Sequence, residues 1–422
     1  MSTPRKHHAA LAIAIAAGCL AWSGAASAAT GVVQGQLKFW QMQGNFCPAT
    51  RDCTGANYLE SAFDTAQPLG EVQVQVVDAA NSSVILGQGS TDASGNYVIA
   101  WTTPAAPPAA RILWKARHKD SRFQIVSASS GGIYFFTSSS FSLTSGTTGG
   151  SPQALSTFTW GSSGSPSAVA NLYDGAWRTW HYALSYSGLM NSLFTGVQIR
   201  AFDATNCPTS CANGATKTIT IDSTTSAFQP QGRIMHEMGH IASYLSKPFV
   251  GTVAYSYPTQ CTGCGSWNLG TPEWLSAGFE EGLATFLGDV AMYWHSAVEP
   301  TTCLSTSSCN AWSIEDSAGD GNCAADEHRW PISTDRYLWD VYDTVDDATY
   351  TDSVNISYWQ FFTTLENYAS GFGNNACDEP WTNSSYNVVD DYDGRDQEAF
   401  FVSLNNKYSV LSLAQALNNC VP

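Results

Sequence analysis

Residues 233–245 read Arg-Ile-Met-His-Glu-Met-Gly-His-Ile-Ala-Ser-Tyr-Leu, and this stretch indicates both a helix and a metal site. Apolar side chains recur here at helical spacing, which predicts an apolar helix from about Gln229 to Ser246. His236 and His240 stand four residues apart and therefore project from one face of that helix. Buried imidazoles need partners, and a shared Zn²⁺ ion would supply one.

Glu237 follows the first histidine directly, so its carboxylate can reach a metal-bound water rather than the metal. Peptide carbonyls are poor electrophiles and neutral water is a poor nucleophile. Zinc would polarise the carbonyl and acidify the water, while a carboxylate would move the proton to the leaving amine. The H-E-x-x-H pattern therefore predicts His236 and His240 as zinc ligands and Glu237 as the general base.

The third ligand must come from farther along the chain. A metzincin would carry Gly and His at positions that here hold Ser243 and Ser246, so that pattern is excluded. Between His240 and Gly282 the only carboxylates belong to Glu273, Glu280 and Glu281.

A second helix is predicted over about 271–294, with large apolar residues on one side and Glu281 on the other. Ala277, Gly278 and Thr285 flank Glu281 and would let the two helices approach closely. We therefore expect Glu281 as the third ligand, with Glu280 and Glu273 as alternatives, and Thr285 as a hydrogen-bond partner of a ligand or a simple packed residue.

The sequence His-Glu-Met-Gly-His at 236–240, followed by Glu-Glu-Gly-Leu-Ala-Thr-Phe at 280–286, resembles the gluzincin metallopeptidases. The resemblance implies a zincin-type catalytic domain, with Glu281 as the zinc-binding glutamate on the second helix. It also implies that a later Tyr or His stabilises the oxyanion, and His328 and Tyr337 are the candidates. The interval between the two helices is longer than in the best-known members and holds Cys261 and Cys264, so the match is to the ligand scheme.

Residues 1–28 predict an export signal, with a basic start, an apolar run from Ala9 to Trp22 and a small-residue cleavage site at 26–28. A lipoprotein signal ending at Cys19 is the alternative. We expect a secreted or periplasmic protein without a membrane span.

Residues 29–160 predict an all-β sandwich, because apolar residues alternate at 71–77 and strand patterns recur at 96–101 and 111–115. The order of these segments and the turn at 92–95 resembles transthyretin-like or carboxypeptidase-regulatory-like β domains. Trp40 and Trp114 are either core residues or, if exposed, a sugar-binding surface.

A Gly- and Ser-rich linker is expected at 161–166, and the pattern beyond it turns helical. The predicted fold is therefore multidomain, an N-terminal β-sandwich followed by an α+β, mainly helical catalytic domain over 167–422.

Cysteines lie in close pairs, as expected of disulfides in an exported chain. The predicted pairs are Cys47–Cys53, Cys207–Cys211, Cys261–Cys264 and Cys377–Cys420, while Cys303, Cys309 and Cys323 would supply one more pair and one spare thiol. Acidic segments at 316–327 and 391–396 are surface turns or, alternatively, structural Ca²⁺ loops.

The net charge of −17 with 18 Lys and Arg argues against nucleic acid and anionic membranes as partners. We therefore expect a secreted zinc metallopeptidase that cleaves proteins or peptides. The alternatives are a catalytically inactive zinc-binding adhesin or interaction protein, and a zinc amidase acting on cell-wall peptides.

Overall fold

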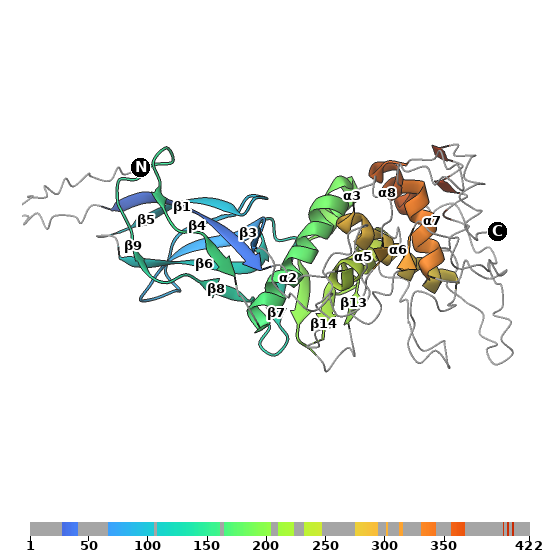
Figure 1. Cartoon of the computed structure of the whole chain (residues 1–422), viewed down its shortest axis with the longest axis horizontal. Helices are drawn as coiled ribbons and strands as arrows, with labels where there is room; N and C mark the ends of the chain where they lie inside the picture. The colour runs from blue at the N-terminus through green and yellow to red at the C-terminus, as the bar shows by residue number, and fades with distance from the viewer. Residues whose placement is uncertain are drawn as a thin grey trace, which may run out of the picture.

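A computed structural model of the chain describes residues 28–40, 66–104, 108–160, 164–203, 210–222, 232–246, 275–293, 301–302, 312–314, 331–342, 356–367 and five positions between 400 and 408. The strands of the N-terminal residues lie at one end of the described molecule, and most helices lie towards the other end, together with some later strands (Figure 1). Several predictions fall outside these residues: the export signal at 1–28 except its last residue, His328, Glu273, both acidic loops and every cysteine except Cys211.

The N-terminal part is rich in strands, as predicted. Strand β1 (Ala29–Trp40) pairs antiparallel with β5 (Asn96–Thr103) and β2 (Ala66–Pro68), and parallel with β10 (Gln153–Ala154) and β11 (Phe158–Trp160). In β5 every second residue is buried, which places Tyr97, Ile99 and Trp101 on the core side.

A second, nine-stranded sheet has the order β13-β14-β12-β7-β6-β3-β4, and β8 and β9 also pair with β6. Its strands are β3 (Val72–Asp78), β4 (Ile85–Ser90), β6 (Ala109–His118), β7 (Phe123–Ser127), β8 (Phe135–Thr137), β9 (Phe141–Ser142), β12 (Val197–Ala201), β13 (Ser210–Asn213) and β14 (Thr218–Ile221).

The two sheets share one core. Trp114 of β6 stacks on Phe158 of β11 with ring centroids 4.1 Å apart, and meets Tyr97 of β5 edge-on at 6.3 Å. Trp114 is fully buried, so it is a core residue and not part of a sugar-binding surface. The predicted turn at 92–95 also forms, with Gly95 at φ +76°, where a Cβ would collide with the carbonyl oxygen of Leu37.

The nine-stranded sheet continues past the predicted linker. Strand β7 pairs in parallel with β12, which pairs in parallel with β14, so residues on both sides of 161–166 share one sheet. Residues 164–166 belong to a helix instead of a linker loop. The expectation of a mainly helical second part is not confirmed, because β12, β13 and β14 make the described architecture a mixed α/β one.

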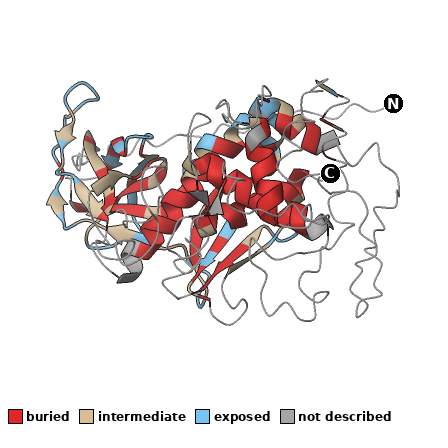
Figure 2. Cartoon of the chain, turned by 45° about the vertical axis from the view of Figure 1, so that its right-hand side comes forward, coloured by how far each residue is buried: buried red, intermediate tan, exposed pale blue. Residues whose placement is uncertain are grey.

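The helices are α2 (Gly164–Arg178), α3 (Gly188–Leu193), α5 (Gly232–Ser246), α6 (Leu275–Met292), α7 (Pro331–Tyr342) and α8 (Tyr358–Asn367). A π-helical turn (Thr179–Ala183) and a 3₁₀ turn (Leu184–Tyr186) join α2 to α3, and β15 (Thr301–Thr302) pairs with β16 (Trp312–Ser313). The described residues of α5 and α6 are almost all buried (Figure 2). No described helix is both long enough and apolar enough to cross a membrane.

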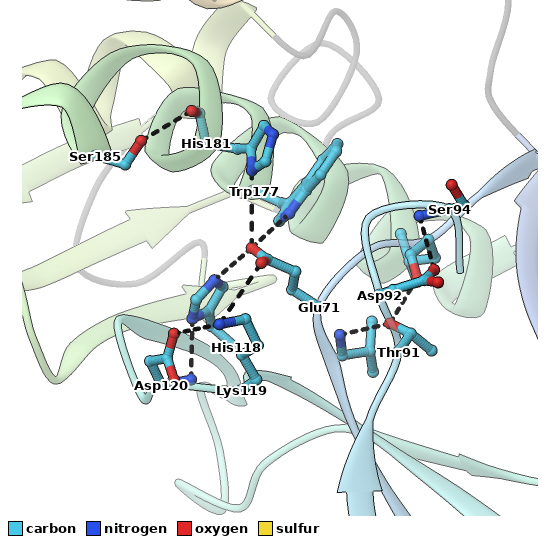
Figure 3. Close-up of polar contacts among 12 residues, drawn as sticks. Glu71, Thr91, Asp92, Ser94, His118, Lys119, Asp120, Trp177, His181 and Ser185 are labelled. Carbon is cyan, nitrogen blue, oxygen red and sulfur yellow. Dashed lines mark hydrogen bonds and ion pairs between the residues drawn. The ribbon is translucent and has the colours of Figure 1, made fainter. Parts of the chain in front are cut away.

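Helix α2 is fixed to the second sheet by Glu71, which precedes β3 and has a φ of +58° (Figure 3). Its Oε2 accepts hydrogen bonds from His118 Nε2 and from Trp177 Nε1 of α2, each at 3.0 Å. The backbone N–H of Asp120 donates to His118 Nδ1 at 3.2 Å, so the proton of the neutral ring sits on Nε2 and points at Glu71. The His118 hydrogen bond is the main reason that the pKa of Glu71 falls from 4.5 to about 2, against the opposing effect of burial.

Replacing Glu71 by Gln should therefore destabilise the fold in a pH-dependent way. A lowered pKa stabilises the folded state above pH 4.5, and this contribution is lost as the pH falls towards 2. At pH 7 the loss should reach up to roughly 3 kcal/mol, and it should shrink steadily below pH 4.5. Urea unfolding at pH 7 and pH 3 measures it. Asp120→Asn, at an exposed ion pair with Lys119, is the control and should change stability by less than about 1 kcal/mol.

Helices α5 and α6 pack closely because small residues face one another. A Cβ on Gly239 would lie 2.7 Å from Ala284 Cα, whereas a Cβ on Gly288 would come no closer than 3.3 Å to Met235. Any side chain at position 239 must therefore push the two helix backbones apart.

We expect Gly239→Ala to destabilise the protein by about 1–3 kcal/mol, less the gain of up to about 1 kcal/mol that alanine brings to a helix. Gly288→Ala, at the same helix pair, is the matched control and should be nearly neutral. Chemical denaturation of both variants measures the difference. Equal stability of the two variants would show that the helices are not in such close contact.

Candidate metal centre

Three side chains converge where α5 crosses α6. His236 Nε2 and His240 Nε2 lie 3.0 Å apart, and Glu281 Oε2 lies 3.1 Å from the first and 3.2 Å from the second. All three residues come from the predicted ligand set, and this group could hold a metal ion. Four ligands placed tetrahedrally at about 2.0–2.1 Å from an ion lie roughly 3.3 Å apart, so only a small expansion would be needed.

The hydrogen bonds around His236 determine which of its two ring nitrogens has a lone pair that could bind a metal ion. Thr285 Oγ1 donates its single proton to the backbone carbonyl of Glu281 at 2.9 Å, so the same oxygen can only accept from His236 Nδ1, 3.1 Å away. With its proton on Nδ1, neutral His236 presents a lone pair at Nε2. That lone pair faces a carboxylate oxygen and a second imidazole, an arrangement of acceptors that a cation would satisfy.

The pKa values of the three residues are shifted by burial and by their contacts with one another. Burial lowers the pKa of His236. Burial also acts to lower the pKa of His240, but the charge and hydrogen bond of Glu281, together with Glu237 and Glu280, outweigh it and raise the value to about 9. Burial acts to raise the pKa of Glu281, yet the two histidines lower it to about 2. Without a metal the cluster therefore retains a proton on its imidazoles, and metal binding would have to displace it.

His118 shows the opposite arrangement in an otherwise similar contact. Its Nε2 also lies 3.0 Å from a glutamate oxygen, that of Glu71, but its Nδ1 accepts from a backbone N–H. Its Nε2 therefore carries the proton and has no lone pair for a metal. The two His–Glu contacts look alike in distance, and only the second nitrogen of each ring distinguishes a ligand from a structural hydrogen bond.

Glu237, on the same helix, is buried at 3% exposure and does not belong to the metal-binding group. Its Oε1 accepts a hydrogen bond of 2.7 Å from Ser210 Oγ, at the start of strand β13. The position agrees with its predicted separation from the ligands. Ser210 was not among the predicted site residues, because no spacing in the sequence connects this strand residue with position 237.

The structure separates the two neighbouring carboxylates of α6. Glu280 Oε2 accepts a hydrogen bond from Ser243 Oγ, one turn after His240, whereas Glu281 joins the imidazoles. Glu281 is thus the ligand candidate, as expected, and the alternative Glu273 lies outside the described residues. Thr285 takes the role of a partner to His236, as anticipated.

The two predicted oxyanion residues differ in what the structure describes of them. Tyr337 lies on α7 and is buried in the hydrophobic core at 1% exposure. His328 lies outside the described residues. The role of both residues stays a prediction.

Comparison with known proteins adds little. No protein-family model matches the chain, and no curated protein matches it. Among solved structures, a 9R-lipoxygenase from Cyanothece PCC8801 is similar at 14% identity with a TM-score of 0.18, covering 35% of this chain and 22% of its own. A TM-score this low establishes no shared fold or function.

Removing the carboxylate of Glu281 should weaken metal binding, whereas removing that of Glu280 should not. We expect Glu281→Gln to lower the affinity for Co²⁺ by at least about 100-fold, since one of three protein ligands is lost, and Glu280→Gln to change it by less than about tenfold. Titration followed by the visible absorption of Co²⁺ measures both. Similar affinities in the two variants would contradict the assignment of the third ligand.

Proposed function

We propose that the chain is a secreted zinc metallopeptidase that hydrolyses peptide bonds in proteins or peptides. The observation that carries the proposal is the convergence of His236, His240 and Glu281 beside a buried carboxylate, Glu237, that is not one of the three. Two imidazoles and one carboxylate are a donor set that suits zinc and leave a fourth position for water or substrate.

The residues divide the chemistry between them. When bound, zinc supplies a Lewis acid that acidifies water and polarises a carbonyl. Glu237 holds one carboxylate oxygen against Ser210, so the other can accept the proton of the attacking water and pass it to the leaving amine. Thr285 keeps the His236 ring in the tautomer that offers Nε2 to the metal.

Access to the centre is consistent with a reactive role. His236 and Glu281 side chains are 1% and 5% exposed, but His240 is 20% exposed, so the cluster has one partly open side. Helix α5, which carries His240, also contacts Ser210 of the outermost strand of the nine-stranded sheet, through Glu237. The export signal predicted at residues 1–28 supports a substrate outside the cell.

Glu237→Gln should strongly reduce hydrolysis and leave zinc in place, because the amide cannot accept the proton yet occupies the same space. Zinc content by atomic spectrometry and digestion of casein measure the two effects, and we expect activity to fall by at least about 10³-fold. Asp78→Asn, at the far end of strand β3, is the control and should retain activity.

Three results would count against the proposal. Undiminished activity in Glu237→Gln would remove the proposed base. Bound zinc without hydrolysis of any peptide by the wild type would favour a zinc-binding interaction protein. Cleavage of peptidoglycan peptides, with casein and a peptide library left intact, would favour a zinc amidase.

A further inference from the structure

The contact between Ser210 and Glu237 links the first residue of strand β13 to the carboxylate beside the metal centre. We propose that Ser210 is a positioning residue that fixes the direction of the Glu237 carboxylate. The inference rests on the proposed function, since it assigns Ser210 a role in the same reaction.

Strand β13 is held along helix α5 at two points. At one end Ser210 donates to Glu237; beyond the other, Gly214 lies so close to the Tyr244 ring that a Cβ there would collide with it. The contacts on α5 are separated by two helical turns, about 10 Å, and four residues of extended chain cover a similar span, about 13 Å. Pairing of Ser210 with Ile221 of β14 fixes the register of the strand. The position of the hydroxyl is therefore set by the pairing in the sheet as well as by the contacts with α5.

A carboxylate in this place needs such a partner. Glu237 is 3% exposed, and a buried charge without a hydrogen-bond donor costs several kcal/mol. The terminal torsion of a glutamate is broad and roughly two-fold, so burial alone does not choose the plane of its two oxygens. The hydrogen bond that Ser210 donates to Oε1 at 2.7 Å fixes the plane of the carboxylate. It leaves Oε2 as the oxygen that exchanges a proton with water.

A purely structural serine would stabilise the β13–α5 contact without affecting the base. The two roles differ in what a substitution changes. A structural role predicts loss of stability, of zinc or of substrate affinity, whereas a positioning role predicts a loss confined to kcat.

The experiment uses the full-length zinc-loaded protein and four variants: Ser210→Ala, Ser210→Thr, Glu237→Gln and the double variant Ser210→Ala/Glu237→Gln. We expect Ser210→Ala to lower kcat for a fluorogenic peptide by about 10–100-fold with KM and zinc content unchanged, since misplacing a catalytic group by about 1 Å has such effects. Ser210→Thr keeps the hydroxyl and should recover activity to within about threefold of wild type. In the Glu237→Gln background Ser210→Ala should have no further effect, because both act through one group.

A crystal structure of the zinc-loaded wild type and of Ser210→Ala supplies a readout that does not depend on activity. We expect Glu237 Oε1 within hydrogen-bond distance of Ser210 Oγ in the first, and a rotated carboxylate in the second. Unchanged kcat in Ser210→Ala, an effect that persists fully without Glu237, or an unmoved carboxylate would overturn the positioning role while the wild type still hydrolyses peptide. A wild type that binds zinc but hydrolyses no peptide would overturn the proposed function, and the positioning role with it.

Discussion

Three side-chain atoms that can each bind a metal ion, held within about 3 Å of one another, are the constraint on which this site depends. His236, His240 and Glu281 place two imidazole nitrogens and one carboxylate oxygen at mutual distances of 3.0–3.2 Å. Thr285 holds the proton of neutral His236 on Nδ1, so His236 Nε2 cannot donate a hydrogen bond to Glu281. The cluster can be stabilised by a proton on His240, but a divalent cation satisfies all three atoms at once.

The fold maintains this convergence by bringing two buried helices very close together. Gly239 and Ala284 form a close contact between α5 and α6, one residue from His240 on the first helix. On the other side of α6, Gly282 lies so close to Pro331 and Thr334 of α7 that a Cβ there would collide with both. Helix α6 is therefore held from two sides at the level of Glu281. The sheet adds a third fixed element, because β13 reaches Glu237 through Ser210.

Sequence reasoning worked best where one periodic element carried the pattern. The spacing of His236 and His240, the small residues beside Glu281 and the gluzincin resemblance together favoured the group that could hold a metal ion, with Glu280 and Glu273 as alternatives. Alternation at 71–77 was enough to predict β3. Prediction from the sequence failed where the structure depends on pairing between strands far apart in the chain. Nothing local in 161–166 shows that β7 and β12 pair across it, so the second part was expected to be mainly helical. The contacts of Ser210 and of His118 are likewise set by the sheet, and tautomers follow from neighbours that spacing does not reveal.

The central claim is that these three atoms bind one zinc ion. Anomalous diffraction on both sides of the zinc absorption edge, from crystals of the zinc-loaded protein, tests it most directly. The account predicts a single strong peak at the common centre of His236 Nε2, His240 Nε2 and Glu281 Oε2, and none beside His118 and Glu71. A peak elsewhere with no density between the three ligands, or zinc at the His118–Glu71 contact instead, would contradict it.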